Sequence, residues 1–359
     1  MNDEDLFKKL AESLNTDGFS VKSDTSYKSV SDSFNDTNTN SNVVEVKHPK
    51  TLFEMRDALE RMKVLRKKRE ESKVSTMDDE ETELLGFLTS GIVLSEIPKH
   101  NEIMGAISSF LVSNGFDEEF VFDNLKNMEG RVLPVEVLNG GKAQALRDHI
   151  DLELDFFDFD SEGKVIGISK DKEELYRHVV THEFFHKLSS YKNGNNDVMV
   201  AGDALIEGFT DYFAKLALGG SKIESDLYSF PVSVCEMFTE IIGIDKSLDD
   251  YVRHTGEFPN LKSLFLECGL DKESFSEFST GLSSVIVSVR RDKEAGLPKS
   301  EWGKDEKMDT LSFLKENIIV PYCRNNPEQA DRILNKFNNL FGASGYSCTM
   351  EEVNEDKKI

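Results

Sequence analysis

At 359 residues, the chain is long enough to bury a core without cross-links, as one large domain or two modest ones. It carries 43 Lys and Arg against 67 Asp and Glu, which gives a formal net charge of −24. A surface this acidic repels phosphate backbones, so the composition argues against nucleic acid as a partner. The four cysteines are widely spaced and form no C-x-x-C pair, so we expect neither a thiolate zinc site nor a disulfide framework.

The N-terminus opens with acidic residues and lacks the unbroken apolar segment of a secretory signal peptide. No other stretch has the length and apolarity of a membrane span. The default expectation is therefore a cytoplasmic protein without a membrane partner, although export by a route that needs no such signal stays open. Polar residues dominate residues 1–48, where we expect a disordered acidic tail, and residues 346–359, where we expect a polar tail.

Residues 49–128 are expected to form a helical N-terminal region. Five apolar residues between 51 and 73 recur at steps of three and four, which places them on one face of a helix: Leu52, Met55, Leu59, Met62 and Leu65. The same helix carries a basic run from Lys63 to Arg69. We interpret this run as a solvated face balanced by the acids at Asp78 to Glu81, in preference to a binding patch.

The first strand pattern lies at residues 150–156, where apolar and acidic residues alternate as in a half-buried strand. Residues 160–163 read as a turn and Val165 to Ile168 as a returning strand, so a hairpin is expected. Beyond residue 203 the pattern is mainly helical. These elements predict an α+β fold in which residues 129–345 form the main domain.

The helix expected after the hairpin contains the sequence H-E-x-x-H, with a start like a capping box at residues 171–174. Four apolar residues at steps of four would face inward: Tyr176, Val180, Phe184 and Leu188. His182 and His186 share another stripe one turn apart, where both imidazoles can reach one zinc ion. Glu183 points alongside the metal and can take a proton from water there. His178 is interpreted as a surface histidine or one that lies behind the ligands.

A catalytic zinc usually takes three protein ligands and a water. Ser189 and Lys192 stand where a metzincin would have glycine and histidine, so that class is excluded. A second helix is expected to begin at Asp203 and to stop at Gly219 and Gly220, with Glu207 in its first two turns. Its buried face would hold four apolar residues, Leu205, Phe209, Phe213 and Leu216, while Glu207 and Asp211 share another face.

These residues resemble the gluzincins, the thermolysin-like clan, in which H-E-x-x-H is completed by a glutamate in E-x-x-x-D on the following helix. The match covers about residues 152–220. The resemblance implies one zinc ion per chain with Glu207 as third ligand, and Asp203 is kept as the fallback ligand. It implies that Asp211 accepts the other N–H of a ligating histidine, most simply His182. It also implies a zincin-like domain whose antiparallel edge strand, here one arm of the 150–168 hairpin, holds an extended peptide.

The function expected from this resemblance is zinc-dependent peptide-bond hydrolysis of a peptide or protein substrate, with Glu183 as general base. Tyr228 and His254 are candidate donors to the oxyanion, and Tyr251 and Arg253 are also available. Two alternatives stay open: a non-catalytic zincin-like scaffold that binds a partner, and an effector or toxin protease that acts in another cell. A further possibility is that the helices at 51–128 regulate access to the cleft.

Overall fold

The computed structural model describes residues 47–138, 141–146, 148–189, 204–223, 225–254 and 257–354. These residues form a mostly helical α+β structure with a small mixed sheet and a separate hairpin. They divide into two compact units, one of described residues within 47–106 and 119–187, the other of described residues within 107–118 and 188–354. No helix in the described ranges is long and apolar enough to cross a membrane. The tail expected at 1–48 lies almost wholly outside these ranges.

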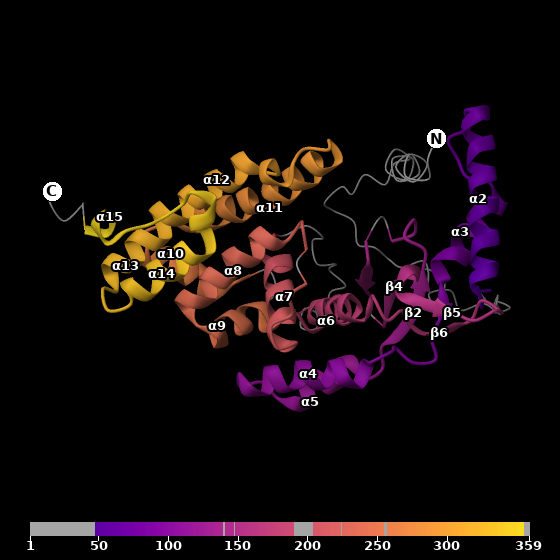
Figure 1. Cartoon of the computed structure of the whole chain (residues 1–359), viewed down its shortest axis with the longest axis horizontal. Coiled ribbons are helices and arrows are strands. Elements are labelled where there is room, and N and C mark those ends of the chain that lie inside the picture. The colour runs from indigo at the N-terminus through magenta and orange to yellow at the C-terminus, as the bar shows by residue number, and fades with distance from the viewer. Residues whose placement is uncertain are drawn as a thin grey trace, which may run out of the picture. The chain divides into compact units, whose positions relative to one another are not determined.

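The first unit is built from helices, short strands and one 3-10 turn, drawn from indigo to magenta in Figure 1. In chain order these elements are α2 (Leu52–Ser72), α3 (Asp79–Ser90), β1 (Ile92–Val93), the start of α4 (His100–Ser113), α5 (Glu118–Leu125), β2 (Glu129–Leu133), β3 (Ala143–Ala145), β4 (His149–Glu153), η2 (Leu154–Phe156), β5 (Phe157–Phe159), β6 (Val165–Ile168) and α6 (Glu173–Ser189).

The second unit is helical in all its described elements, from the end of α4 onward (Figure 1). They are α7 (Ala204–Ala217), α8 (Ser229–Ile242), α9 (Ile244–Leu248), η4 (Asp249–Arg253), α10 (Pro259–Glu267), α11 (Lys272–Glu294), η5 (Lys299–Glu301), α12 (Lys304–Phe313), η6 (Leu314–Ile319), α13 (Val320–Asn325), α14 (Ala330–Phe341), η7 (Gly342–Ser344) and α15 (Met350–Asn354).

Helix α2 matches the helix expected at residues 51–73, and it lies beside α3 (Figure 1). It starts where the Thr51 side chain accepts the Glu54 N–H and ends at Lys73, which has a φ of 52°. The basic run does contact the acidic segment at residues 78–81, because the Arg69 Nε lies 3.2 Å from a carboxylate oxygen of Glu81. That glutamate is 1% exposed, so part of this face is a buried ion pair and not a solvated surface.

The larger sheet has the strand order β1-β2-β4-β3, with β2 and β4 parallel and the outer pairs antiparallel. Its apolar face includes Val132, Ile150 and Leu152, none of which is exposed. The opposite face carries Arg131 beside Asp151. Strands β1, β2 and β3 were not expected from the sequence, since each is five residues or shorter and lacks the alternation seen at residues 150–156.

The turn expected at residues 160–163 is present, but the strand that pairs across it is not the expected one. β6 pairs with β5 and not with β4, because the chain makes the 3-10 turn η2 between the two. This turn places the ring of Phe156 5.6 Å and the ring of Phe157 5.9 Å from the ring of Tyr176, edge to face. β4 therefore lies inside the larger sheet, and the edge strand beside it is β3.

The second unit is centred on stacked and edge-to-face aromatic rings between neighbouring helices. Phe209 of α7 stacks on Phe258 at 5.8 Å, and Phe265 of α10 meets Phe275 of α11 at 5.3 Å. All four cysteine thiols are free, as expected. This core holds α7 between α8 and α11.

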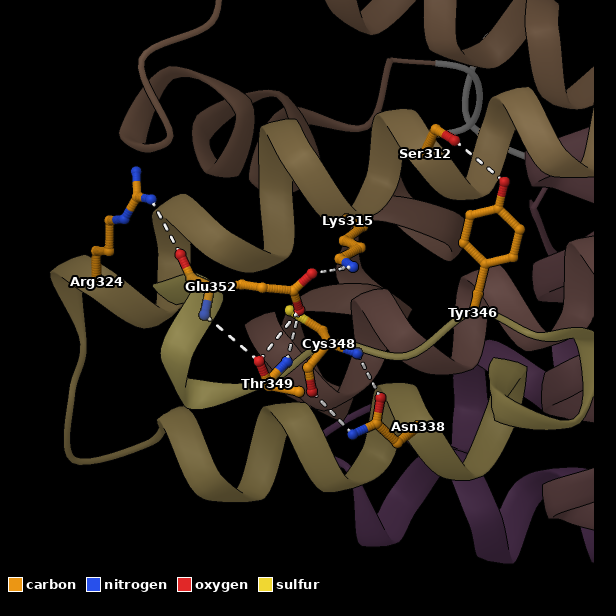
Figure 2. Close-up of polar contacts among 8 residues, drawn as sticks. All are labelled: Ser312, Lys315, Arg324, Asn338, Tyr346, Cys348, Thr349 and Glu352. Carbon is orange, nitrogen blue, oxygen red and sulfur yellow. Dashed lines mark hydrogen bonds and ion pairs between the residues drawn. The ribbon is translucent and has the colours of Figure 1, made fainter. Parts of the chain in front are cut away.

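The segment around α15, within the expected polar tail, is bound to the helices before it (Figure 2). The Asn338 side chain accepts the N–H of Cys348 at 2.8 Å and donates to its carbonyl oxygen at 3.0 Å. Lys315 pairs with Glu352 at 2.6 Å, and Arg324 donates to the Glu352 carbonyl oxygen at 3.3 Å. These bonds come from three different helical segments, so the chain closes back on its own unit.

The buried carboxyl of Asp151 predicts a pH-dependent stability. Desolvation raises its pKa to about 6, against the opposing charges of His149 and Arg131. The folded state then favours protonated Asp151, so this contribution to stability is complete below the unfolded pKa of 3.8 and is lost as the pH rises through 6. We expect Asp151→Asn to be more stable than wild type at pH 8, by on the order of 2 kcal/mol, and nearly equal to it at pH 4.

Urea unfolding at the two pH values measures this difference directly. A stability difference that is the same at pH 4 and pH 8 would contradict the account.

Candidate metal centre

Helix α6 carries the H-E-x-x-H motif, and its inward-facing side chains fix its rotation. Tyr176, Val180, Phe184 and Leu188 are all 0% exposed, as the sequence predicts. The Tyr176 hydroxyl donates a hydrogen bond of 3.0 Å to the carbonyl oxygen of Pro98. With this stripe buried, the helix cannot turn about its axis without exposing four large side chains, so the direction of the motif histidines is set by the core.

His182 and His186 turn their imidazoles toward the same point. Their Nε2 atoms are 3.0 Å apart, and the rings lie 4.6 Å apart at 77°. Both residues are buried, at 9% and 8% exposure. Two nitrogens bound tetrahedrally to one zinc at about 2.0–2.1 Å stand about 3.3 Å from each other. The observed separation therefore fits a shared metal ion as well as a hydrogen bond between neutral rings.

Glu207 joins these histidines. One ligand atom from each of His182, His186 and Glu207 lies within 4.8 Å of the others. Two imidazole nitrogens with one carboxylate oxygen suit zinc in a site that keeps a position open for water. The structure thus contains a His-His-Glu group that could hold a metal ion.

Glu207 lies in the first turn of α7, as expected. The start of this helix is fixed by α11, since the N–H of Ala204 donates to the hydroxyl oxygen of Ser283 at 3.2 Å. Its neighbour Gly208 faces α8, where a Cβ atom would come within 2.7 Å of the Cys235 sulfur. The glycine therefore permits a close approach of the two helices next to Glu207.

The apolar face expected for α7 is present except at its end. Leu205, Phe209 and Phe213 are 0% exposed, whereas Leu216 is 36% exposed. Leu216 lies in the last turn, just before the helix stops at Gly219, which has a φ of +73°. Residue periodicity indicates which face is apolar but not how far a neighbouring helix covers it.

Glu183, the expected general base, is half-buried, and its Oε2 accepts the main-chain N–H of Ala145 at 2.8 Å. The donor belongs to the edge strand β3, 38 residues earlier in the chain. This bond engages Oε2, so the other carboxylate oxygen of Glu183 can accept a proton from another group. Sequence reasoning missed it, because a main-chain donor in a short strand has no side-chain signal.

Asp211 lies one turn beyond Glu207 and is 1% exposed. Its Oδ2 pairs with the Lys215 ammonium at 3.1 Å, an i,i+4 contact on the same helix. This pair was not predicted, although the spacing of Asp211 and Lys215 carries the signal for it. The expected bond from His182 to Asp211 stays a prediction.

The two candidate oxyanion donors have different surroundings. Tyr228 lies just before α8 and is half-buried. His254 is exposed, with its Nε2 3.6 Å from a carboxylate oxygen of Asp249. Tyr251, also considered, is fully buried, and its hydroxyl lies 2.6 Å from that of Thr210. Tyr251 is therefore part of the core, while the roles of Tyr228 and His254 stay predictions.

Two further expectations concern residues near the motif. His178 is 4% exposed, so the first of its two expected positions, at the surface, is wrong, while a place behind the ligands stays a prediction. The side of α6 that carries His178 is buried, which the spacing of the histidines in the sequence does not indicate. Asp203, the fallback ligand, lies outside the described residues.

Comparison of the chain with protein-family models, with curated proteins and with solved structures finds no match. The features that bear on function are therefore the motif residues, the group they form and the hydrogen bond to Glu183.

The glycine next to Glu207 allows a test of how α7 is seated. In Gly208→Ala, the added methyl group would meet Cys235 and the Pro231 carbonyl oxygen at 2.7 and 2.8 Å, so α7 and α8 must separate. We expect a loss of about 1–3 kcal/mol in the free energy of unfolding. The matched control is Gly281→Ala in α11, where a Cβ meets nothing within 4 Å.

The control should gain about 0.5–1 kcal/mol, because alanine favours a helix over glycine. Chemical denaturation of the variants and wild type gives both values. Equal effects of the two substitutions would show that the α7–α8 contact is not close.

Proposed function

We propose that the chain is a zinc-dependent peptidase of the gluzincin type, with His182, His186 and Glu207 as metal ligands and Glu183 as general base. The observation that carries the proposal is the grouping of these three donors within 4.8 Å, two of them on the helix that also carries Glu183. A zinc ion in such a set supplies a Lewis acid that polarises a carbonyl group and makes water acidic enough to react near neutral pH.

Glu183 does the proton transfer in this proposal. With Oε2 bound to the Ala145 N–H, the other carboxylate oxygen accepts a proton from the attacking water and later gives it to the leaving amine. The buried Asp211 carboxylate, which pairs with Lys215, would accept a hydrogen bond from a ligating histidine and so orient its ring. Tyr228 or His254 would stabilise the negative charge on the substrate oxygen.

The substrate of this proposal is an extended peptide. The strand that holds it is β3 and not β4, because β4 is enclosed by β2 and β3 in the sheet, and β3 is the strand joined to Glu183. Edge strands bind extended chains by main-chain pairing, which favours unfolded segments over folded domains.

The first test is metal content. Purified wild-type protein should hold about one zinc per chain, removable by a chelator. His182→Ala and Glu207→Ala should each lose it, because two ligands hold zinc poorly, whereas His254→Ala should keep it. Elemental analysis after dialysis measures this. Full zinc in Glu207→Ala together with zinc loss in Asp203→Ala would move the third ligand to Asp203.

The second test separates binding from chemistry. Glu183→Gln should keep the metal and the hydrogen bond from Ala145, since a glutamine oxygen also accepts, but it cannot take a proton. We expect hydrolysis of labelled, unfolded casein to fall by a factor of about 10² or more.

Retained turnover in Glu183→Gln would refute the base role. A wild-type protein that binds zinc but cleaves nothing would support the non-catalytic scaffold instead.

A further inference from the structure

The register of strand β3 determines which of its main-chain groups are free. Ala145 pairs with Ile150 of β4, and Ala143 with Leu152. The Leu146 N–H donates to His149 at 2.8 Å, so this flanking pair is of the hydrogen-bonded kind. Pairs in an antiparallel ladder alternate between bonded and non-bonded kinds.

It follows that Gln144 turns its N–H and C=O toward β4, whereas Ala143 and Ala145 turn theirs away from the sheet. The Ala145 N–H confirms this geometry, since it is the group that reaches Glu183 at 2.8 Å. This bond therefore joins the sheet edge to α6, and its acceptor is the side chain that the proposed function uses as base.

We propose that the main-chain amide of Ala145 is the positioning group for Glu183, so that β3 orients the base and binds the peptide with the same edge. The inference rests on the proposed function. A glutamate side chain has three rotatable bonds, and a donor on one oxygen restricts it to a conformation in which the other oxygen faces the reacting water.

This assignment also restricts how a peptide can bind. A peptide strand beside β3 would normally form bonds with both the N–H and the C=O of each outward-facing residue. The N–H of Ala145 is already bound to Glu183, so only Ala143 can make the two-bond contact, while Ala145 offers its carbonyl oxygen alone. The register of the peptide relative to Glu183 is thereby fixed.

Hydrogen exchange tests the bond without requiring activity. Full-length protein is measured with chelator and again with added zinc. In wild type the Ala145 amide should exchange more slowly than that of Ala143, although both face away from the sheet. In Glu183→Ala it should exchange about 10-fold faster or more, whereas Glu183→Gln, which keeps an acceptor, should retain most of the protection.

The Gln144 amide faces β4 and reports whether the sheet is intact. Equal exchange of Ala145 and Ala143 in wild type would overturn the proposal. So would full protection of Ala145 in Glu183→Ala while Gln144 is unchanged.

A second measurement needs no Glu183 variant. Ala145→Pro removes the N–H at a position that donates no ladder bond, where proline is tolerated in an edge strand, and Ala145→Ser keeps the donor. With labelled casein, the proline variant should keep zinc and a KM within about 3-fold of wild type, and lose kcat by about 10-fold or more. The serine variant, which keeps the donor, should lose less kcat than the proline variant.

A kcat in Ala145→Pro equal to that of Ala145→Ser would overturn the positioning role, as would a change in KM alone. The proposed function fails separately: if wild type cleaves no peptide, the kinetic test has no signal, but the exchange pattern still decides whether Ala145 holds Glu183.

Discussion

The buried stripe of α6 is the constraint on which the candidate site depends. Four large side chains at steps of four are withdrawn completely from solvent, and this fixes the rotation of the helix. The rotation of the helix then determines the direction in which the side chains on its other faces point. One of these faces directs two imidazoles to a common point, and the residue between them reaches the edge of the sheet. Burial of apolar surface thus supplies the order that the polar site requires.

The parts of this structure that sequence predicts are the local ones. Helix α2, the inward stripe of α6 and the stop of α7 at Gly219 each follow from residues within one or a few turns of each other. The H-E-x-x-H spacing belongs to the same class, because i and i+4 are neighbours on any helix. The grouping of Glu207 with the histidines needed the resemblance as well, since periodicity alone cannot bring two helices together.

What sequence could not predict depends on partners far along the chain. β1 pairs with β2 across about 40 residues, and two residues in a strand leave no periodic pattern. The pairing of β6 with β5 depends on the packing of the Phe156 and Phe157 rings against Tyr176, which no local pattern in the sequence indicates. The exposure of Leu216 and the burial of His178 have the same origin, because each depends on what a neighbouring element covers.

The hydrogen bonds and the ion pair that hold the segment around α15 affect how the second unit unfolds. Chain ends usually fray at little cost in free energy, independently of the rest of the fold. Here release would break the two hydrogen bonds between the Asn338 side chain and the main chain of Cys348, and it would expose Val353, which is 2% exposed when docked. The segment contacts three consecutive helical segments, η6, α13 and α14, so its loss removes contacts from all three together. Fraying of this segment is thereby coupled to the loosening of these three helical segments.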